Sequence, residues 1–515
     1  MSQSISHKII RNTIFNTTGR FIGIVVAFFM TPYIVGHLGV ERFGIWAIVG
    51  VLTGYIGLLD FGIGTSFVKY IAEFYAKKDY EKINELINTG FVFYSVLAAL
   101  IIVPGFFVTN PLLVVFHIPD VMRSEASFVF LVGIVLFSMS NALSPFNSIL
   151  EGLQLMDISN KVNVVMSIPN IIGTIFFLEK GYGLSGLMIN NAINFVLMSL
   201  LKIIISFKIL PEIRFDPSLF SREMFKKLFE FGYKLQFSRL AYLVNFQTDK
   251  LLITYFLGIG FVTFYQLGTT ILQRVREIPL LMVSALVPAV SEIATKHGHS
   301  ALTELHLRGS KYLIFVSTPF LFFLMTNASL IMLVWMGRGY ERAALVIQVL
   351  SIGYFAATIS GVASTVAVGV AKTEFEMRYG MLMVPLNLIM SYILIIKMGF
   401  VGAVAGTSLS LVIGAVFFLS MFHKYLNSPA INFSRLFLKP VFVSAILSLI
   451  MLILNYHVWP TNTYQPRAGL SVILGINCLV FAGIYLSLMR LSRYFDDYDS
   501  ALLKNRIPFL GYIFR

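Results

Sequence analysis

The sequence predicts an all-α polytopic membrane protein with about fourteen transmembrane helices. Of the 515 residues, 57% are hydrophobic and 12% are charged, whereas soluble domains carry about 25% charged residues. The mean hydropathy is +0.82. Apolar runs of the roughly 20 residues that a spanning helix needs recur along the whole chain. No run alternates with the period of two that is typical of a membrane barrel.

The apolar runs define fourteen candidate spans, because each is long enough for a helix to cross the hydrocarbon core. In chain order they are 13–36, 43–67, 88–109, 126–148, 159–179, 184–207, 232–256, 262–291, 312–336, 343–370, 379–397, 401–422, 439–457 and 469–490. The run at 262–291 is the longest. At a rise of 1.5 Å per residue it measures about 45 Å, so we expect it to project beyond the bilayer.

The basic residues predict the orientation, because lysine and arginine gather in cytoplasmic loops. With the N-terminus inside, 27 of the 39 basic residues fall in cytoplasmic segments, 7 in outer loops and 5 within helices. A wrong helix count would scramble this alternation from the error onward. We therefore expect both termini to lie inside. The net charge of +14 follows mostly from this bias and does not require a nucleic acid partner.

An internal repeat predicts the domain organisation. At an offset of 219 residues, Arg20 meets Arg239, Leu38-Gly39 meets Leu257-Gly258, and Glu73 meets Glu292. Because an even number of helices separates the copies, two pseudo-symmetric six-helix lobes would be related by an axis along the membrane normal. The predicted parts are an N-terminal lobe 1–210, a cytoplasmic linker 211–231, a C-terminal lobe 232–423, a helix pair 436–490 and an interfacial tail 491–515.

Charged residues inside helices are costly in a bilayer and usually line a cavity or pathway. The cations within the predicted helices are Arg20, Arg239, Lys250, Arg274 and Arg276. Guanidinium groups suit bidentate binding of phosphate oxygens. These five residues therefore predict a cationic cavity for an anionic, phosphate-bearing substrate. In the alternative interpretation, Arg20 and Arg239 extend from the cytoplasmic ends of their helices to lipid headgroups.

The predicted helices hold fewer carboxylates, and the candidates are Asp60, Asp249 and Glu277. They either pair with the cations or carry a coupling proton or sodium ion. No other cofactor, no metal site and no enzymatic activity are predicted. The single cysteine, Cys478, excludes a Cys-based metal site, and the sequence has neither a P-loop nor an HExxH motif. The outer loops are too short for the catalytic loops of a membrane glycosyltransferase or polymerase.

Two stretches carry a family resemblance. The chain from Arg20 through TPYIVGHLGVERFGIWAIV, followed by LLDFGIGTSFVKYIAEFYAKKDYEKINELI, resembles the N-terminal region of Wzx-type oligosaccharide flippases. These proteins belong to the multidrug/oligosaccharidyl-lipid/polysaccharide exporter superfamily. The motifs that carry the likeness are the LG…FG.W turn after the first helix and D.G.G near the end of the second.

The resemblance implies a flippase that moves undecaprenyl-diphosphate-linked oligosaccharide across the cytoplasmic membrane for O-antigen, capsule or exopolysaccharide assembly. The family alternates between inward- and outward-open states around a cationic central cavity, while the lipid tail stays in the bilayer. In the relative that flips the peptidoglycan precursor, helices thirteen and fourteen shape a groove for that tail. The cationic residues of helices one and eight in that relative correspond to Arg20 and to Arg274 or Arg276. Implied partners are membrane lipids, glycosyltransferases and a polysaccharide polymerase.

Two alternatives share the fold. A multidrug or toxin antiporter would favour acidic residues in a hydrophobic cavity, and the arginine excess argues against it. A flippase for the peptidoglycan precursor itself would make the protein essential to the cell.

Overall fold

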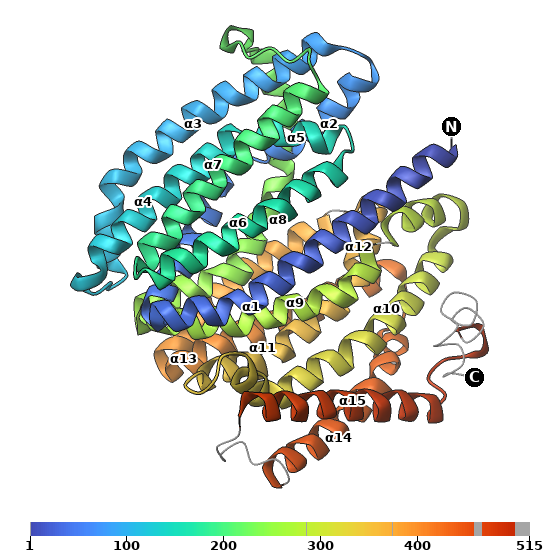
Figure 1. Ribbon diagram of the computed structural model, residues 1–515. Coiled ribbons are helices and arrows are strands. Elements are labelled where there is room, and N and C mark those ends of the chain that lie inside the picture. The colour runs from blue at the N-terminus through green and yellow to red at the C-terminus, as the bar shows by residue number, and fades with distance from the viewer. Residues whose placement is uncertain (1, 285, 373, 458–465, 500–515) are drawn as a thin grey trace. The chain divides into compact units, whose positions relative to one another are not determined.

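A computed structural model describes residues 2–284, 286–372, 374–457 and 466–499. Every element in these ranges is helical, with fifteen α-helices and two short 3-10 helices (Figure 1). The predicted all-α class is therefore confirmed.

The helices divide at the middle of the chain. The first part contains α1 (Ser2–Ile56), η1 (Gly57–Asp60), α2 (Ile63–Ala76), α3 (Tyr80–Val115), α4 (Asp120–Ala142), α5 (Ser144–Gly152), α6 (Met156–Glu179), α7 (Gly183–Ile209), η2 (Pro217–Leu219) and α8 (Arg222–Leu257). The second part contains α9 (Ile259–Ser284), α10 (Leu286–Trp335), α11 (Glu341–Ile359), α12 (Gly361–Gly369), α13 (Glu374–Leu426), α14 (Ala430–His457) and α15 (Arg467–Leu491).

Ten stretches of the described residues are long and apolar enough to cross a membrane. One of them, Glu374–Leu426, contains the predicted spans 379–397 and 401–422, and another, Gly23–Asp60, overlaps parts of the predicted spans 13–36 and 43–67. The helices α8, which holds the predicted span 232–256, and α9, which holds the predicted span 262–291 only as far as Ser284, carry charged and polar residues and are not among the ten. The chain is thus a multi-pass membrane protein, and the number of fourteen spans remains a prediction.

The chain forms two compact units, Met1–Thr263 and Phe264–Arg515. Within the first unit, α8 contacts α1, α2 and α3. The sequence places the start of the second lobe at residue 232, inside α8. That lobe boundary and the pseudo-symmetry of the lobes remain predictions.

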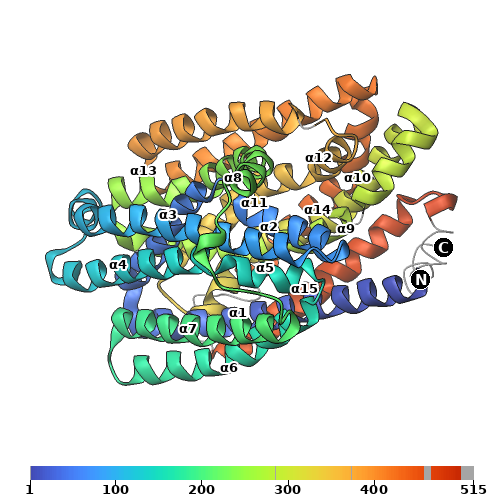
Figure 2. The same ribbon diagram turned by 90° about the horizontal axis from the view of Figure 1, so that it is seen from above.

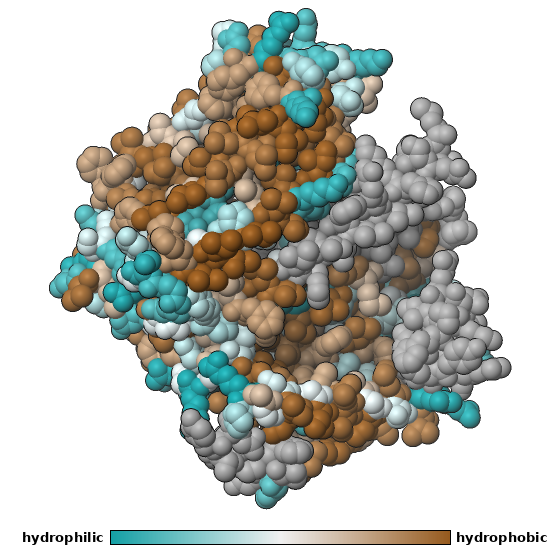
Figure 3. All heavy atoms as spheres, viewed as in Figure 1, coloured by the Kyte–Doolittle hydropathy of each residue, from teal (hydrophilic) through white to brown (hydrophobic). Residues whose placement is uncertain are grey.

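The first unit is built from antiparallel helices joined by short connections. The pairs α3 with α4 and α6 with α7 lie side by side in both ribbon views (Figures 1 and 2). Their outer face is dominated by hydrophobic residues, with polar residues concentrated toward the helix ends (Figure 3). An exposed apolar surface of this extent is typical of contact with lipid.

The predicted helix at 43–67 is interrupted near its end. Phe61 and Gly62 have φ values of 51° and 74°, which separate η1 from α2. A Cβ atom added at Gly232 would lie 2.6 Å from the carbonyl carbon of Gly62, so α2 and α8 touch backbone to backbone here. The hydroxyl of Ser66 donates to the carbonyl of Leu228 at 3.0 Å. These contacts fix the crossing of the two helices, and they require glycine at its closest point.

Two asparagines hold the predicted linker 211–231 against α3. The side-chain amides of Asn84 and Asn88 donate to the carbonyls of Glu212 at 2.9 Å and Arg214 at 2.8 Å. Their side-chain oxygens accept from the backbone N–H groups of Arg214 at 2.6 Å and Asp216 at 2.9 Å. The first part of the linker is therefore a fixed element whose backbone polar groups are satisfied.

Left-handed residues recur at the corners between helices. Gly39, inside α1, has φ 79° and ψ 172°, and Gly258, after α8, has φ 96° and ψ 163°. The two positions are 219 residues apart, which is the offset of the predicted repeat. Other left-handed corners pair at nearly the same separation: Lys78 with Gly298, His117 with Gly337, and Gln154 with Ala371. The agreement supports an internal repeat.

In the second unit, α10 packs against α11, α12, α14 and α15. An asparagine cluster, formed by Asn327, Asn455 and Asn477, joins α10 to the last two helices. The amides of Asn455 and Asn477 donate to the side-chain oxygen of Asn327 at 3.2 and 3.0 Å, and Asn477 also donates to Asn455 at 2.8 Å. Interhelical amide bonds of this kind stabilise helix association in a membrane.

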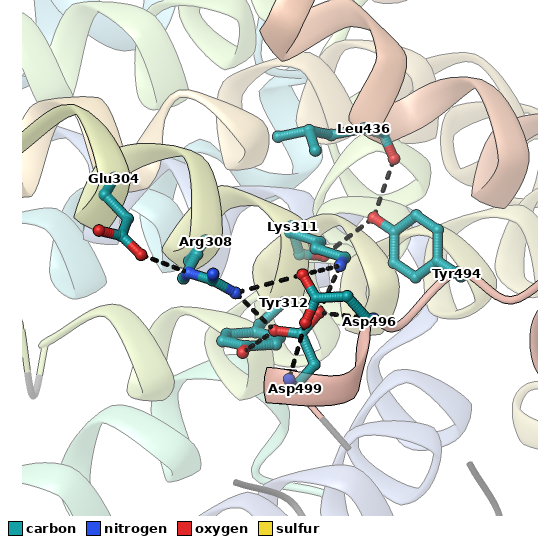
Figure 4. A network of polar contacts seen from close by, with 8 residues as sticks. All are labelled: Glu304, Arg308, Lys311, Tyr312, Leu436, Tyr494, Asp496 and Asp499. Atoms are coloured by element: carbon teal, nitrogen blue, oxygen red, sulfur yellow. Dashed lines mark hydrogen bonds and ion pairs between the residues drawn. The ribbon is translucent and has the colours of Figure 1, made fainter. Parts of the chain in front are cut away.

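The segment after α15 folds back onto α10 (Figure 4). Asp499 is fully buried and accepts hydrogen bonds from Lys311 and Tyr312. Arg308 contacts Asp499 at 3.2 Å and Asp496 at 3.4 Å. Backbone N–H groups of Asp496 and Asp499 bond to each other's carboxylates at 3.2 and 2.8 Å. The predicted tail is thus anchored as far as residue 499, and its remainder, 500–515, lies outside the described residues.

Candidate functional site

The five predicted cations divide between the two units. Arg20, Arg239 and Lys250 lie on α1 and α8 in the first unit, and Arg274 and Arg276 lie on α9 in the second. The side chains of Arg20 and Arg239 lie outside the described residues. A single cavity that all five residues share remains a prediction.

Asp60 lies at the interruption between η1 and α2 and is 7% exposed. Its carboxylate accepts the backbone N–H of Gly64 at 3.2 Å and the hydroxyl of Tyr94 on α3. The N–H groups of a helix's first turn lack partners within the helix, and a carboxylate also interacts favourably with the positive end of the helix dipole. Asp60 therefore stabilises the start of α2 and joins it to α3.

A buried polar stretch of α8 contains Thr248, Asp249 and Lys250. The ammonium group of Lys250 donates to the side-chain oxygen of Gln247 at 2.6 Å. Thr248 shares a hydrogen bond with Tyr55 of α1. A buried charge is costly unless it is paired or hydrogen-bonded, and here Lys250 has both a hydrogen bond and the neighbouring Asp249. Whether Asp249 and Lys250 act as a local charge pair or serve the proposed cavity remains a prediction.

The two arginines of α9 have different surroundings. Arg274 forms an ion pair with Glu277 at 3.3 Å, and both side chains are about half exposed. The guanidinium carbon of Arg276 lies 5.6 Å from the centre of the Tyr354 ring on α11, within the range of a cation–π contact. On the same helix, the side-chain amide of Gln266 donates to the hydroxyl of Thr270 one turn further on at 3.1 Å. Arg274 is therefore accessible, whereas Arg276 is held against an aromatic ring.

Sequence reasoning missed several uncharged partners of these groups. Tyr94, Tyr55 and Tyr354 lie in apolar runs, where a tyrosine has the same pattern as a core residue. It also missed Glu376, at the start of α13, which accepts a hydrogen bond from Ser364 of α12. Within the described ranges, no three His, Cys, Asp or Glu side chains gather into a group that would hold a metal ion.

Comparison with known proteins identifies relatives of the chain. The family described as polysaccharide biosynthesis protein matches residues 9–294. The "Putative O-antigen transporter" of Shigella flexneri is 21% identical over 419 residues, which cover 79% of this chain and 96% of that protein. An uncharacterized membrane protein of Methanocaldococcus jannaschii is 21% identical over 449 residues, which cover 83% of this chain and 87% of the relative.

Solved transporter structures share the fold. The lipid II flippase MurJ, in an inward closed conformation, aligns with a TM-score of 0.67 at 15% identity and covers 92% of this chain and 98% of its own. An inward-facing multidrug resistance transporter of the MATE family also aligns with a TM-score of 0.67, at 16% identity, and covers 78% of this chain and 94% of its own. The fold alone does not distinguish between these two kinds of transporter.

Proposed function

Because the chain belongs to the polysaccharide biosynthesis protein family, we propose that it is a flippase for undecaprenyl-diphosphate-linked oligosaccharide in the cytoplasmic membrane. It would serve O-antigen, capsule or exopolysaccharide assembly by alternating access, beside glycosyltransferases and a polysaccharide polymerase. The kinship to a transporter named for O-antigen supports this substrate class over a drug or toxin. Fourteen spans with both termini inside belong to the same proposal.

The observation that carries the proposal is the state of Arg274. An ion pair between half-exposed side chains, such as Arg274 with Glu277 at 3.3 Å, contributes only about 0–1 kcal/mol. A charge-assisted hydrogen bond from a guanidinium to phosphate contributes about 1.5–3 kcal/mol, and the fork can form two of them. A diphosphate carries more negative charge than a carboxylate and offers acceptors to both arms of the guanidinium, so it would compete with Glu277 for Arg274. Arg276, two residues further along α9, would add to the positive potential of this helix.

The arginine test compares charge with geometry. Arg274→Ala should abolish surface polysaccharide, and Arg274→Lys should restore it only in part, because lysine keeps the charge but cannot bind bidentately. Arg276→Ala should also reduce it. Arg435→Ala, which removes an exposed arginine of α14, is the matched control and should have no effect. Protein level in the membrane is measured for every variant. Normal polysaccharide in both alanine variants would refute the proposed role of α9.

Coupling to a proton or sodium ion is part of the proposal, with Asp60, Asp249 and Glu277 as candidate carriers. Glu277→Gln separates two roles of that residue. If Glu277 only pairs with Arg274, the neutral variant frees the arginine and transport continues. If Glu277 carries the ion, transport in proteoliposomes no longer responds to an imposed proton or sodium gradient. Transport that is indifferent to Asp60→Asn, Asp249→Asn and Glu277→Gln would remove all three as carriers.

The peptidoglycan-precursor alternative makes a different prediction. Deleting the gene would be lethal if the chain alone supplied lipid II to the outer face. Deletion that leaves viable cells without surface polysaccharide would favour the proposed substrate.

A further inference from the structure

Three lysines from different helices surround one pair of aromatic rings in the first unit. The ammonium groups of Lys69 on α2 and Lys227 on α8 lie 4.8 and 4.7 Å from the centre of the Tyr70 ring. Lys227 also lies 5.0 Å, and Lys82 of α3 lies 5.8 Å, from the centre of the Phe74 ring. We call Lys69, Lys82 and Lys227 the lysine cluster. Two of its charges are less than 10 Å apart, because both lie within 5 Å of one ring centre.

The cluster is built on a fixed frame. Tyr70 and Phe74 are buried in the core of the first unit, and their rings stack at 6.1 Å. Phe231 of α8 packs against Tyr70 at 6.1 Å, and the ammonium of Lys69 lies 4.2 Å from its centre. The backbone contact between α2 and α8 described above lies one to two turns away along each helix. The lysine stems therefore start from positions that packing holds in place.

The charges of the cluster are only partly balanced. Glu73 is the carboxylate on the same face of α2, and it is hydrogen-bonded to Lys77 at 2.7 Å. That bond, together with the charges of Lys77, Lys227 and Lys69, lowers the pKa of Glu73. One carboxylate thus lies in the field of several ammonium groups. Like charges at such separations repel one another weakly in water, and an anion bound between them would relieve that repulsion.

The surroundings of the lysine cluster indicate that it lies at the depth of the lipid headgroups. The segments 69–82 and 202–234 are predicted to lie on the cytoplasmic side. Exposed aromatic residues flank the cluster, namely Tyr75, Phe229 and Tyr233. Aromatic side chains gather at membrane–water interfaces, and basic pockets between helices on the cytoplasmic side bind anionic headgroups. Lysine, with a mobile point charge, suits a phosphodiester that offers a single negative charge.

We propose that Lys69, Lys82 and Lys227 bind the phosphate headgroup of an anionic phospholipid of the inner leaflet. The site lies within one unit, on helices α2, α3 and α8. It is distinct from the arginines of α9, and its lipid is a resident of the membrane and not the transported substrate. The inference depends on the membrane location of the chain and is independent of the proposed flippase activity.

Lipid binding to the purified full-length protein tests the proposal. Native mass spectrometry would count phosphatidylglycerol molecules retained by the wild type and by the double variant Lys69→Gln/Lys227→Gln. We expect retention to fall at least five-fold. The control, Lys78→Gln/Lys226→Gln, removes the same charge from exposed neighbours outside the cluster and should reduce retention less than two-fold. Gel filtration confirms that each variant is folded, and Lys69→Arg/Lys227→Arg should retain the lipid.

Several outcomes would overturn the proposal. Equal losses in the two glutamine pairs would mean that diffuse positive charge, and not this cluster, binds the lipid. Retention of phosphatidylcholine as strong as that of phosphatidylglycerol would show that anionic charge is not selected. A third arm uses undecaprenyl diphosphate as the probe. If its binding falls in the cluster variant while phosphatidylglycerol binding does not, the site belongs to the transported lipid.

Discussion

Replacing Asp499 with asparagine should release the segment that follows α15. The carboxylate of Asp499 accepts hydrogen bonds from Lys311 and Tyr312 and contacts Arg308 at 3.2 Å. Burial would raise its pKa, but the hydrogen bonds from Lys311 and Tyr312 and the charge of Lys311 outweigh burial and hold the pKa below its ordinary value. The ionised carboxylate is therefore the form that the fold stabilises.

The free energy lost on Asp499→Asn follows from the contacts that Lys311 and Arg308 keep in the variant. Breaking a buried ion pair costs about 3–5 kcal/mol when one charge is left uncompensated. Here Lys311 is 13% exposed and keeps Asp496 at 3.9 Å, and Arg308 keeps Asp496 at 3.4 Å. We therefore expect a smaller loss of about 2–3 kcal/mol, close to that of one charge-assisted hydrogen bond. At tenfold per 1.4 kcal/mol, local opening becomes about 30- to 150-fold more frequent.

Hydrogen exchange of the backbone over residues 492–499 measures this opening, because exchange of a local segment reports its own free energy. Asp497→Asn is the matched control, since Asp497 is exposed and belongs to the same segment. It should leave the exchange rate unchanged. An increase below about three-fold for Asp499→Asn, or equal increases for both variants, would refute the role assigned to the network.

Three further predictions concern other conditions and positions. Because the folded pKa of Asp499 is lowered, the stabilisation that this carboxylate provides is complete above the unfolded pKa of about 3.9 and is lost as the pH falls through the folded pKa. Protection of residues 492–499 from hydrogen exchange, relative to an unfolded peptide, should therefore hold between pH 7 and 5 and fall below pH 4. Loss of protection already at pH 6 would contradict this. Gly232→Ala should lower the thermal unfolding midpoint, because the new methyl group meets the backbone of Gly62 and such overpacking costs about 1–3 kcal/mol. The control is Gly483→Ala, which has open space around the site and should not lower the midpoint. Asn477→Leu loses two interhelical hydrogen bonds, each worth about 0.6 kcal/mol on average, so a small drop in the same midpoint is expected and an increase would contradict the assigned role.

The fold class could be predicted because the hydropathy of a segment indicates directly whether it lies in lipid or in water. Long apolar runs and the distribution of basic residues need no knowledge of tertiary contacts. The interruption at Phe61 and Gly62 could not be found in this way, because it interrupts the backbone within an apolar run. The anchoring of 211–231 was also missed, since Asn84 and Asn88 have no local signal that names their distant partners.

For the site, sequence reasoning identified charges but not their neighbours. The spacing of Arg274 and Glu277 places them one turn apart on one helix, and the structure shows them paired. Tyr94 lies 34 residues from Asp60, and no periodicity connects the two. A contact that depends on how α2 crosses α3 can be identified only from the tertiary structure.

The recurring left-handed corners bear on how the ancestry of such a chain is recognised. Gly298 and Gly337 are matched in the first half by Lys78 and His117, so a positive φ is shared where the amino acid is not. An L-residue in this conformation carries about 1–2 kcal/mol of strain. A positive φ at a non-glycine residue therefore indicates that the chain has to turn at that position. The sign of φ at these corners therefore supports the predicted repeat independently of the residue identities that first indicated it.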